Sequence, residues 1–190
     1  MGSEMCIRDR PMARMLPGIE TLAQHQEQLR DDLDAYRPER CPHCGKAGMH
    51  RHGHYVRNAP RGEGIAFSLG LVFIPRFYCP KCRVTCSRLP APLAPRRQYW
   101  WQAQQAVVQG LISGQSIREM ARRMWPSRRT IGRWWKWLQG RFAVHALHLR
   151  SRFAQLGRSA DWKAFWSLCF ERMRLSEAMG WLDRAGVSVP

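Results

Sequence analysis

Four cysteines are the residues of this chain whose types and spacing point most directly to chemistry. They form two Cys-x-x-Cys pairs, Cys41 with Cys44 in CPHCG and Cys79 with Cys82 in CPKC. Two thiolates three residues apart in a tight turn can both reach one metal ion, and Pro and Gly favour such a turn. Two such turns supply the four sulfurs of a closed tetrahedral zinc site. The spacing therefore predicts one structural Zn²⁺ bound by these four side chains.

The same pairs have a second interpretation, as redox or disulfide-forming motifs. Thioredoxin-like Cys-x-x-Cys motifs occur in a βαβ context, whereas these pairs lie among strand-like and Gly-rich sequence. Cys86 follows Cys82 by four residues and is a fifth candidate ligand, but four sulfurs already close the site. We expect Cys86 and Cys169 to be small buried hydrophobic side chains.

Positive charge is the second strong signal. The chain of 190 residues has a net charge of +17, and residues 40–160 hold 22 Lys and Arg against two acids. Such a basic segment implies a polyanionic partner, and nucleic acid is favoured over a membrane surface. No run of ~18 apolar residues predicts a transmembrane helix, and no signal peptide is visible. We therefore expect a cytoplasmic, nucleoid-associated protein in a reducing compartment.

A small β region must position the two cysteine pairs. Residues 49–57 alternate as a strand, and an Arg-Gly-Glu-Gly turn at residues 61–64 follows. The clearest strand pattern is at residues 65–74, where we expect Pro75 to break the register before the second pair. Its alternating apolar residues are Ile65, Phe67, Leu69, Leu71 and Phe73.

Three histidines share one face of the first strand. His50, His52 and His54 occupy alternate positions, which lie ~6.6 Å apart on a strand. That separation favours a polar or phosphate-facing role over shared binding of one metal ion. Before this region, residues 19–36 predict an acidic helix with one apolar stripe, which either has a solvated face, dimerises, or docks on the basic body.

Three helices follow the Pro-rich linker. We predict them at residues 98–112, 117–124 and from 128 to 139 or beyond. Ser116 and Ser127 are the expected N-caps, and Glu119 should complete a capping box with Ser116. A tight Trp125-Pro126 turn joins the last two, which predicts a helix-turn-helix. The alternative is an ordinary helical hairpin with a solvated basic face.

Basic side chains on this pair of helices predict how DNA is contacted. In a helix-turn-helix, the N-terminal residues of the second helix reach base edges. Arg128, Arg129 and Thr130 are expected to face bases, and Arg133 either bases or backbone. Phosphate contacts are expected from Lys136, Arg122 and Arg123. Arg96 and Arg97 either enter a minor groove or begin a solvated helix.

The predicted fold class is α+β, a small β zinc ribbon followed by a mostly α-helical helix-turn-helix domain. The expected divisions are a disordered or spurious leader (1–17), an N-terminal helix (18–38), the zinc ribbon (39–89), the linker (90–97), the helix-turn-helix (98–141) and a C-terminal helical tail (142–190).

The sequence resembles the N-terminal half of bacterial insertion-sequence transposases, and small bacterial proteins of unassigned function that keep only this half. The resemblance covers roughly residues 40–138, in CPHCG, HRHG, RFYCPKCRVTCSRLP and SIREMARRMWPSRRTIGRWW. It implies that Cys41, Cys44, Cys79 and Cys82 bind zinc. It also implies that residues 127–136 form a recognition helix that reads the ends of the element.

The chain departs from these transposases beyond Leu138. They cut DNA with three carboxylates on a ribonuclease-H-like sheet that holds two metal ions, whereas the acids here lie on helical sequence: Asp161, Glu171, Glu177 and Asp183. We therefore expect a sequence-specific protein of mobile-element origin that binds double-stranded DNA, with no catalytic residues and no small-molecule substrate. One alternative is a transposase fragment or accessory subunit that acts with a separate catalytic chain, and another is a non-specific or RNA-binding zinc-ribbon protein. The partners to consider beside DNA are a second copy of the chain, in a homodimer, and a transposase subunit.

Overall fold

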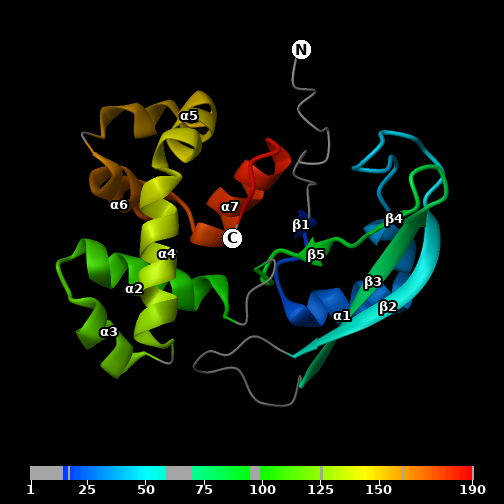
Figure 1. Cartoon of the computed structure of the whole chain (residues 1–190), viewed down its shortest axis with the longest axis horizontal. Helices are drawn as coiled ribbons and strands as arrows, with labels where there is room; N and C mark the ends of the chain where they lie inside the picture. Colours follow the sequence, from blue (N-terminus) through cyan, green and yellow to red (C-terminus); the bar gives the residue numbers. More distant parts are fainter. Residues whose placement is uncertain are drawn as a thin grey trace, which may run out of the picture.

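The computed structural model of the chain describes residues 15–16, 18–58, 70–94, 99–124, 126–159 and 161–189. Within these residues the fold is α+β, as predicted, with seven α-helices and two small sheets. Helices α2 to α7 gather on one side of the molecule and the larger sheet lies on the other, with strands β1 and β5 between them (Figure 1). The predicted leader lies outside the described residues up to Arg14, as do Arg96, Arg97 and Trp125.

The larger sheet is antiparallel, with strand order β2-β3-β4. Its strands are β2 (His50–Asn58), β3 (Leu71–Cys79) and β4 (Val84–Cys86). The second sheet pairs β1 (Met15–Leu16) in parallel with β5 (Leu89–Pro90). The predicted turn at residues 61–64 and the first half of the strand predicted at residues 65–74 lie outside the described residues.

Strand β3 runs through Pro75 without ending, but its buried face changes there. Val72 and Ile74 are buried on one side of Pro75, and Phe77 and Cys79 on the other. Opposite this point, β2 shifts register between Arg51 and His54. The predicted break in register is therefore a bulge within one continuous strand pair.

The helix predicted at residues 19–36 is two shorter elements, which corrects that prediction. Helix α1 spans Leu22–Asp31 and a 3₁₀ helix spans Leu33–Tyr36. Thr21 forms a capping box with Gln24, which explains why α1 begins at Leu22. Asp32 leaves the helical conformation at φ −149°, and its side chain accepts a hydrogen bond from the Asp34 amide.

The helical part of the chain has six α-helices after the linker: α2 (Trp101–Ile112), α3 (Ile117–Arg123), α4 (Arg128–Gly140), α5 (Phe142–Arg152), α6 (Trp162–Arg172) and α7 (Leu175–Arg184). The helix predicted at residues 98–112 begins at Trp101. The sequence predicts one helix over residues 142–157, but α5 ends at Arg152 and a 3₁₀ helix, Ala154–Arg158, follows it. Within the described chain, no helix is both long enough and apolar enough to cross a membrane.

Candidate metal centre and nucleic-acid interface

The four predicted cysteines meet at one point. The sulfur atoms of Cys41 and Cys82 are 3.6 Å apart, as are those of Cys44 and Cys79. All four sulfurs lie within 4.8 Å of one another. Each short contact joins one sulfur from each Cys-x-x-Cys pair, so the two turns interlock around a common centre. The cluster could hold a metal ion.

The sulfur positions fit a tetrahedral ion. Metal–sulfur bonds of about 2.3 Å in a tetrahedron place the sulfurs about 3.8 Å from one another, close to the two 3.6 Å contacts. A disulfide would need about 2.05 Å, and the cysteines in the described chain are all free. The geometry therefore supports metal binding over the disulfide interpretation.

The two turns share one backbone design. The Gly45 amide donates to the Cys41 carbonyl oxygen at 2.7 Å, and the Arg83 amide donates to the Cys79 carbonyl oxygen at 2.8 Å. Both donors have a positive φ, +72° at Gly45 and +59° at Arg83. Gly adopts this conformation at little cost, whereas Arg carries the strain of a Cβ in the left-handed region. The role of Arg83 was not predicted from the sequence, although its position after the last cysteine of CPKC matches that of Gly45 in CPHCG.

Backbone hydrogen bonds also change how readily the cysteine thiols ionise. The amide of Cys82 donates to the sulfur of Cys79, which lowers the pKa of that thiol to about 7. Desolvation, helped by the hydrogen bond to the sulfur of Cys41, raises the pKa of Cys82 to about 12. Four thiols this close resist ionising together because their negative charges repel. A cation at the centre would relieve that repulsion.

Two further cysteines are buried, as predicted. Cys86 is 6% exposed and packs with Phe77 and Met49 beside the four-sulfur cluster. Burial raises the pKa of Cys86 to about 11 and that of Cys169 to about 12. Both thiols are therefore protonated, small apolar side chains at neutral pH.

The three histidines of β2 are exposed and lie apart from the cysteines. Among the described residues, the cysteines are the one group of three or more side chains that could hold a metal ion. The His52 ring lies 5.5 Å from that of Tyr78, and the His54 ring lies 5.2 Å from that of Phe73. These histidines therefore belong to an exposed aromatic face.

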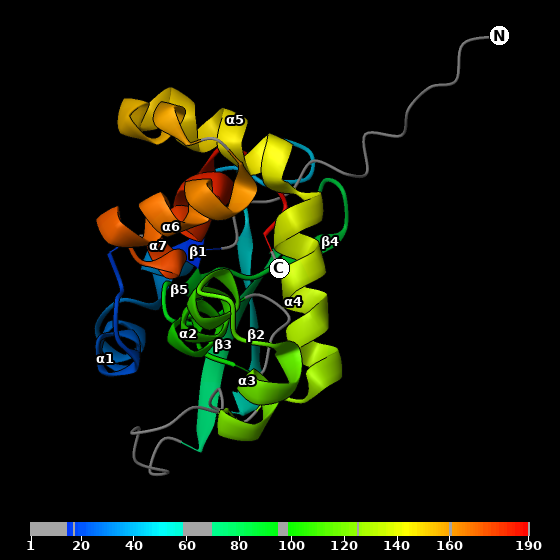
Figure 2. The ribbon, with the colours of Figure 1, turned by 90° about the vertical axis from the view of Figure 1, so that its left-hand side faces the viewer.

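Helices α3 and α4 form the second candidate site. The apolar period predicts Ile131, Trp134 or Trp135, and Leu138 as the inward positions of this helix, and α4 buries Ile131, Trp134 and Leu138. Ile131 and Trp134 pack with Met120 of α3. Figure 2 shows α3 at the lower end of α4. A Cβ at Gly110 of α2 would lie 2.6 Å from the Met120 sulfur, so this glycine permits the close approach of α2 to α3.

Serine caps begin both helices, as predicted. Ser116 Oγ accepts from the Glu119 amide at 3.1 Å, and Ser127 Oγ accepts from the Thr130 amide at 3.3 Å. The Glu119 carboxylate lies 3.4 Å from Arg123, four residues along the same helix. It therefore pairs within α3, and the capping box predicted for this residue is half formed.

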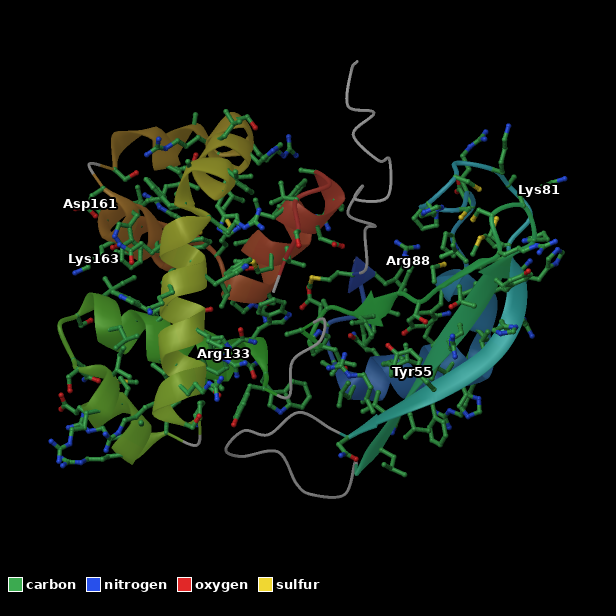
Figure 3. The ribbon with its side chains drawn as sticks, in the orientation of Figure 1. Tyr55, Lys81, Arg88, Arg133, Asp161 and Lys163 are labelled. Carbon is green, nitrogen blue, oxygen red and sulfur yellow. The ribbon has the colours of Figure 1, made fainter. Side chains whose placement is uncertain are left out.

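The outer face of α4 is basic. Arg128, Arg129, Arg133 and Lys136 are exposed, and the helix contains no acidic residue. Thr130 is half-buried and its hydroxyl accepts from Arg133 at 3.4 Å. Arg122 and Arg123 are exposed at the end of α3. Figure 3 shows Arg133 on α4 and Lys81 beside the cysteine cluster in opposite halves of the molecule.

The carboxylates beyond Leu138 are dispersed and mostly bound to backbone. Asp161 accepts from the amides of Lys163 and Ala164 at the start of α6, at 2.7 and 2.9 Å (Figure 3). Glu177 accepts from the Arg174 amide, and buried Asp183 accepts from the Met15 amide at 2.8 Å. Glu171 is exposed. Asp161 and Glu177 thus cap helices, and Asp183 joins two distant segments of the chain.

The comparisons with known proteins give one match. A family described as "Domain of unknown function (DUF6431)" matches residues 41–134. No curated protein and no solved structure matches the chain. The matched segment begins at Cys41 and ends at Trp134, so it contains all four cysteines, the sheet, α2, α3 and the first half of α4. The matched segment therefore holds the whole cysteine cluster and the first part of the basic face of α4, up to Arg133, while Lys136 lies beyond it.

Proposed function

We propose that the chain is a sequence-specific protein that binds double-stranded DNA, with α4 as its recognition helix and a structural Zn²⁺ at the four cysteines. The observation that carries this proposal is that the two sides of α4 differ. Ile131, Trp134 and Leu138 are buried on one side, while the other side exposes four cations and no acid.

The contacts of α3 and α4 support a helix-turn-helix. Both helices have serine caps, and Met120 of α3 packs against Ile131 of α4. An α-helix fits the major groove of B-DNA and not the deep groove of A-form RNA. Arg128 and Arg129 lie in the first turn of α4, where such helices read bases. A guanidinium can donate two hydrogen bonds to the O6 and N7 atoms of guanine.

Zinc is the proposed ion because the donor set is entirely sulfur and closed. Four thiolates complete a tetrahedral shell and leave no position for a substrate. A bound ion would cross-link the two turns and so join β3 and β4 to the segment before β2. The four cysteines are thereby assigned a structural role, which is separate from DNA reading by α4.

The proposed mobile-element origin rests on the resemblance to the DNA-binding half of insertion-sequence transposases. The bound and dispersed carboxylates beyond Leu138 favour a DNA-binding role without DNA cleavage. An accessory subunit that works with a separate catalytic chain is the alternative from the same origin. Such a subunit would also bind DNA through α4. The first test therefore concerns the contacts between α4 and DNA.

The test is a binding selection on random duplexes with the zinc-loaded protein, followed by salt titrations of two variants. Arg129→Ala should weaken binding by about 1–3 kcal/mol and relax preference at one base pair. Lys136→Ala should weaken binding to all sequences alike and lower the salt slope by about one unit. Equal losses on every sequence in both variants would reduce α4 to an electrostatic face and contradict sequence-specific reading.

A further inference from the structure

A pocket of about 750 Å³ lies where the N-terminal part of the chain meets α7. One wall comes from β1 and the start of α1, with Leu16 and Leu22, and the opposite wall comes from α7 and the end of α6. Figure 1 shows α7 beside β1 near the middle of the molecule. The hydrogen bond from the Met15 amide to Asp183 joins the two walls. The volume is within the range of small-ligand sites.

Helix α7 has one face in the helical core and another in this pocket. Leu175, Met179 and Leu182 are buried in the core. The residues of α7 that line the pocket recur mostly at intervals of three or four positions: Ser176, Glu177, Gly180, Trp181 and Arg184. The core therefore holds α7 in place while its second face is available to a ligand.

Gly180 is the unusual residue on the pocket face. It is buried in the middle of α7, where glycine destabilises a helix relative to alanine. Outside the backbone of α7, a Cβ here would make one ordinary contact, at 3.7 Å to the Arg184 guanidinium. At Gly110, by contrast, a Cβ would lie 2.6 Å from the Met120 sulfur. Close packing therefore does not require the glycine at position 180, and the missing side chain leaves space in the pocket.

Aromatic side chains form much of the pocket lining. Trp100 and Trp101 at the start of α2 are buried, and Phe153 and Trp181 are half-buried. The Trp181 ring stands edge-on to that of Phe153, with 5.8 Å between the ring centres. Aromatic rings pack well against other rings in edge-on or offset arrangements. The lining therefore suits a ligand with a flat aromatic body.

The charged side chains that line the pocket leave two cations without an acidic partner. Glu20 and Glu177 are both in the lining, but each pairs with Arg174, at 3.5 and 3.7 Å. Arg172 and Arg184 also line the pocket, and neither forms an ion pair in the part of the chain that the structure describes.

The charged groups around the pocket do not cancel these two cations. Arg152 and Arg184 both contact the Trp181 ring, at 4.9 and 4.1 Å from its centre, so a third guanidinium lies close by. The buried Asp183 carboxylate accepts a hydrogen bond from a backbone amide. Glu171 is exposed and lies outside the lining. The site therefore favours a ligand that carries negative charge.

We propose that this pocket binds a small aromatic carboxylic acid. The ring of the ligand lies among Trp100, Phe153 and Trp181, and its carboxylate meets Arg172 and Arg184. A guanidinium can donate two parallel hydrogen bonds to a carboxylate. The ligand contacts both walls and so joins the N-terminal segment to the helices. No residue of α4 or of the cysteine cluster is in the lining, so the proposal does not depend on DNA binding.

The first test is calorimetric titration of the full-length zinc-loaded protein with 2-naphthoate and with its uncharged counterpart, 2-naphthylmethanol. Wild type should bind 2-naphthoate about tenfold more tightly, because hydrogen bonds to a charged group are the stronger ones. Arg172→Gln and Arg184→Gln should each weaken 2-naphthoate binding and leave 2-naphthylmethanol binding unchanged. The matched control is Arg118→Gln, which removes an exposed charge from α3 and should bind both compounds as wild type does.

The second test fills the pocket through Gly180. Gly180→Leu should raise the melting temperature, since leucine favours a helix more than glycine does, and should abolish 2-naphthoate binding because its side chain occupies the pocket. Gly180→Ala should also raise the melting temperature but weaken binding less. A gain in stability together with a loss of binding separates pocket filling from misfolding.

Three results would overturn the proposal. The first is absent 2-naphthoate binding in wild type, or equal affinity for the charged and uncharged compounds. The second is wild-type affinity for 2-naphthoate in Gly180→Leu, which would place the ligand elsewhere. The third is a lower melting temperature in Gly180→Ala, which would show that packing requires the glycine.

Discussion

The sheet region and the helical region carry similar basic character but are stabilised in different ways. Among the described residues, two buried clusters line the sheet: one has seven members, which include Cys41, Cys79 and Cys86, and the other has six, which include Val72 and Ile74. The main helical core has sixteen, including Trp101, Phe165 and Trp166. A segment as small as the sheet region buries too little apolar surface to be stable alone. Each cluster at the sheet is smaller than the helical core, so we expect the sheet to need a metal cross-link, whereas the helices have a core of their own.

Loss of the metal ion should give the largest difference in stability between the sheet region and the helical region. We expect one Zn²⁺ per wild-type chain and none in Cys79→Ser. Structural zinc binding contributes about 10–16 kcal/mol in small zinc domains, so the sheet should unfold in Cys79→Ser while α2 to α7 stay folded. Metal analysis and hydrogen exchange, followed peptide by peptide, measure both outcomes.

The control for metal loss is Cys86→Ala. Cys86 is buried beside the cluster but outside the group of four sulfurs. This variant should keep its zinc and the exchange protection of the sheet. Zinc loss in Cys86→Ala would show that the ligand set is wrong. Unfolding of α2 to α7 together with the sheet in Cys79→Ser would show that the two regions are not independently stabilised.

The helical region should respond to acid through His145. This side chain is fully buried between Trp137 and Trp166, and neither ring nitrogen has a hydrogen-bond partner in the described chain. Burial lowers its pKa to about 4. Between pH 6.5 and 4, the unfolded chain therefore binds more protons than the folded chain. The free energy of unfolding consequently decreases as the pH is lowered from 6.5 to 4. The loss should be about 2 kcal/mol between pH 7 and pH 5.

The variant that tests this response is His145→Phe, which keeps a ring in the aromatic pocket and removes both nitrogens. Urea unfolding followed by helical circular dichroism at pH 7 and pH 5 measures the difference. Comparison at each pH cancels the contribution of the cysteines, which both proteins share. The wild type should lose about 2 kcal/mol more than His145→Phe. Equal losses in the two proteins would place the acid sensitivity elsewhere.

The smallest expected effects distinguish the two cysteine turns within the sheet region. A Cβ at Gly45 would meet no atom within 4 Å, so Gly45→Ala adds only the strain of a positive φ. That strain is about 1–2 kcal/mol, and zinc affinity should fall about tenfold in chelator competition. Arg83→Gly should relieve the same strain and raise affinity a few-fold. A loss of affinity in both variants would mean that the Arg83 side chain itself supports the site.

Local patterns predicted much of the fold and both candidate sites. The Cys-x-x-Cys spacing predicted the sulfur cluster, and the serine caps with the 3.6-residue apolar period predicted the start and buried face of α4. These features depend on residues a few positions apart. Interactions between residues close in sequence are therefore enough to predict the cysteine cluster and the start and buried face of α4.

Contacts between distant residues could not be predicted in this way. The hydrogen bond from the Met15 amide to the Asp183 carboxylate joins residues 168 positions apart in the sequence. The hydrogen bonds of His25 to Tyr36 and Phe73 join α1 to the sheet, and no local pattern reveals them. Alternation at Leu71 and Phe73 indicates a strand but not which face is buried. The exposure of Phe73 on the outer face of β3 was therefore not predicted.

Changing one atom of the DNA tests whether α4 reads bases in the major groove. In the selected duplex, the guanine whose preference Arg129→Ala relaxes is replaced by 7-deazaguanine, which lacks the N7 acceptor exposed in the major groove. Wild-type binding should weaken about tenfold, whereas Arg129→Ala should lose nothing further, because the contact is already absent. An equal loss in both proteins, or no loss in wild type, would contradict the claim.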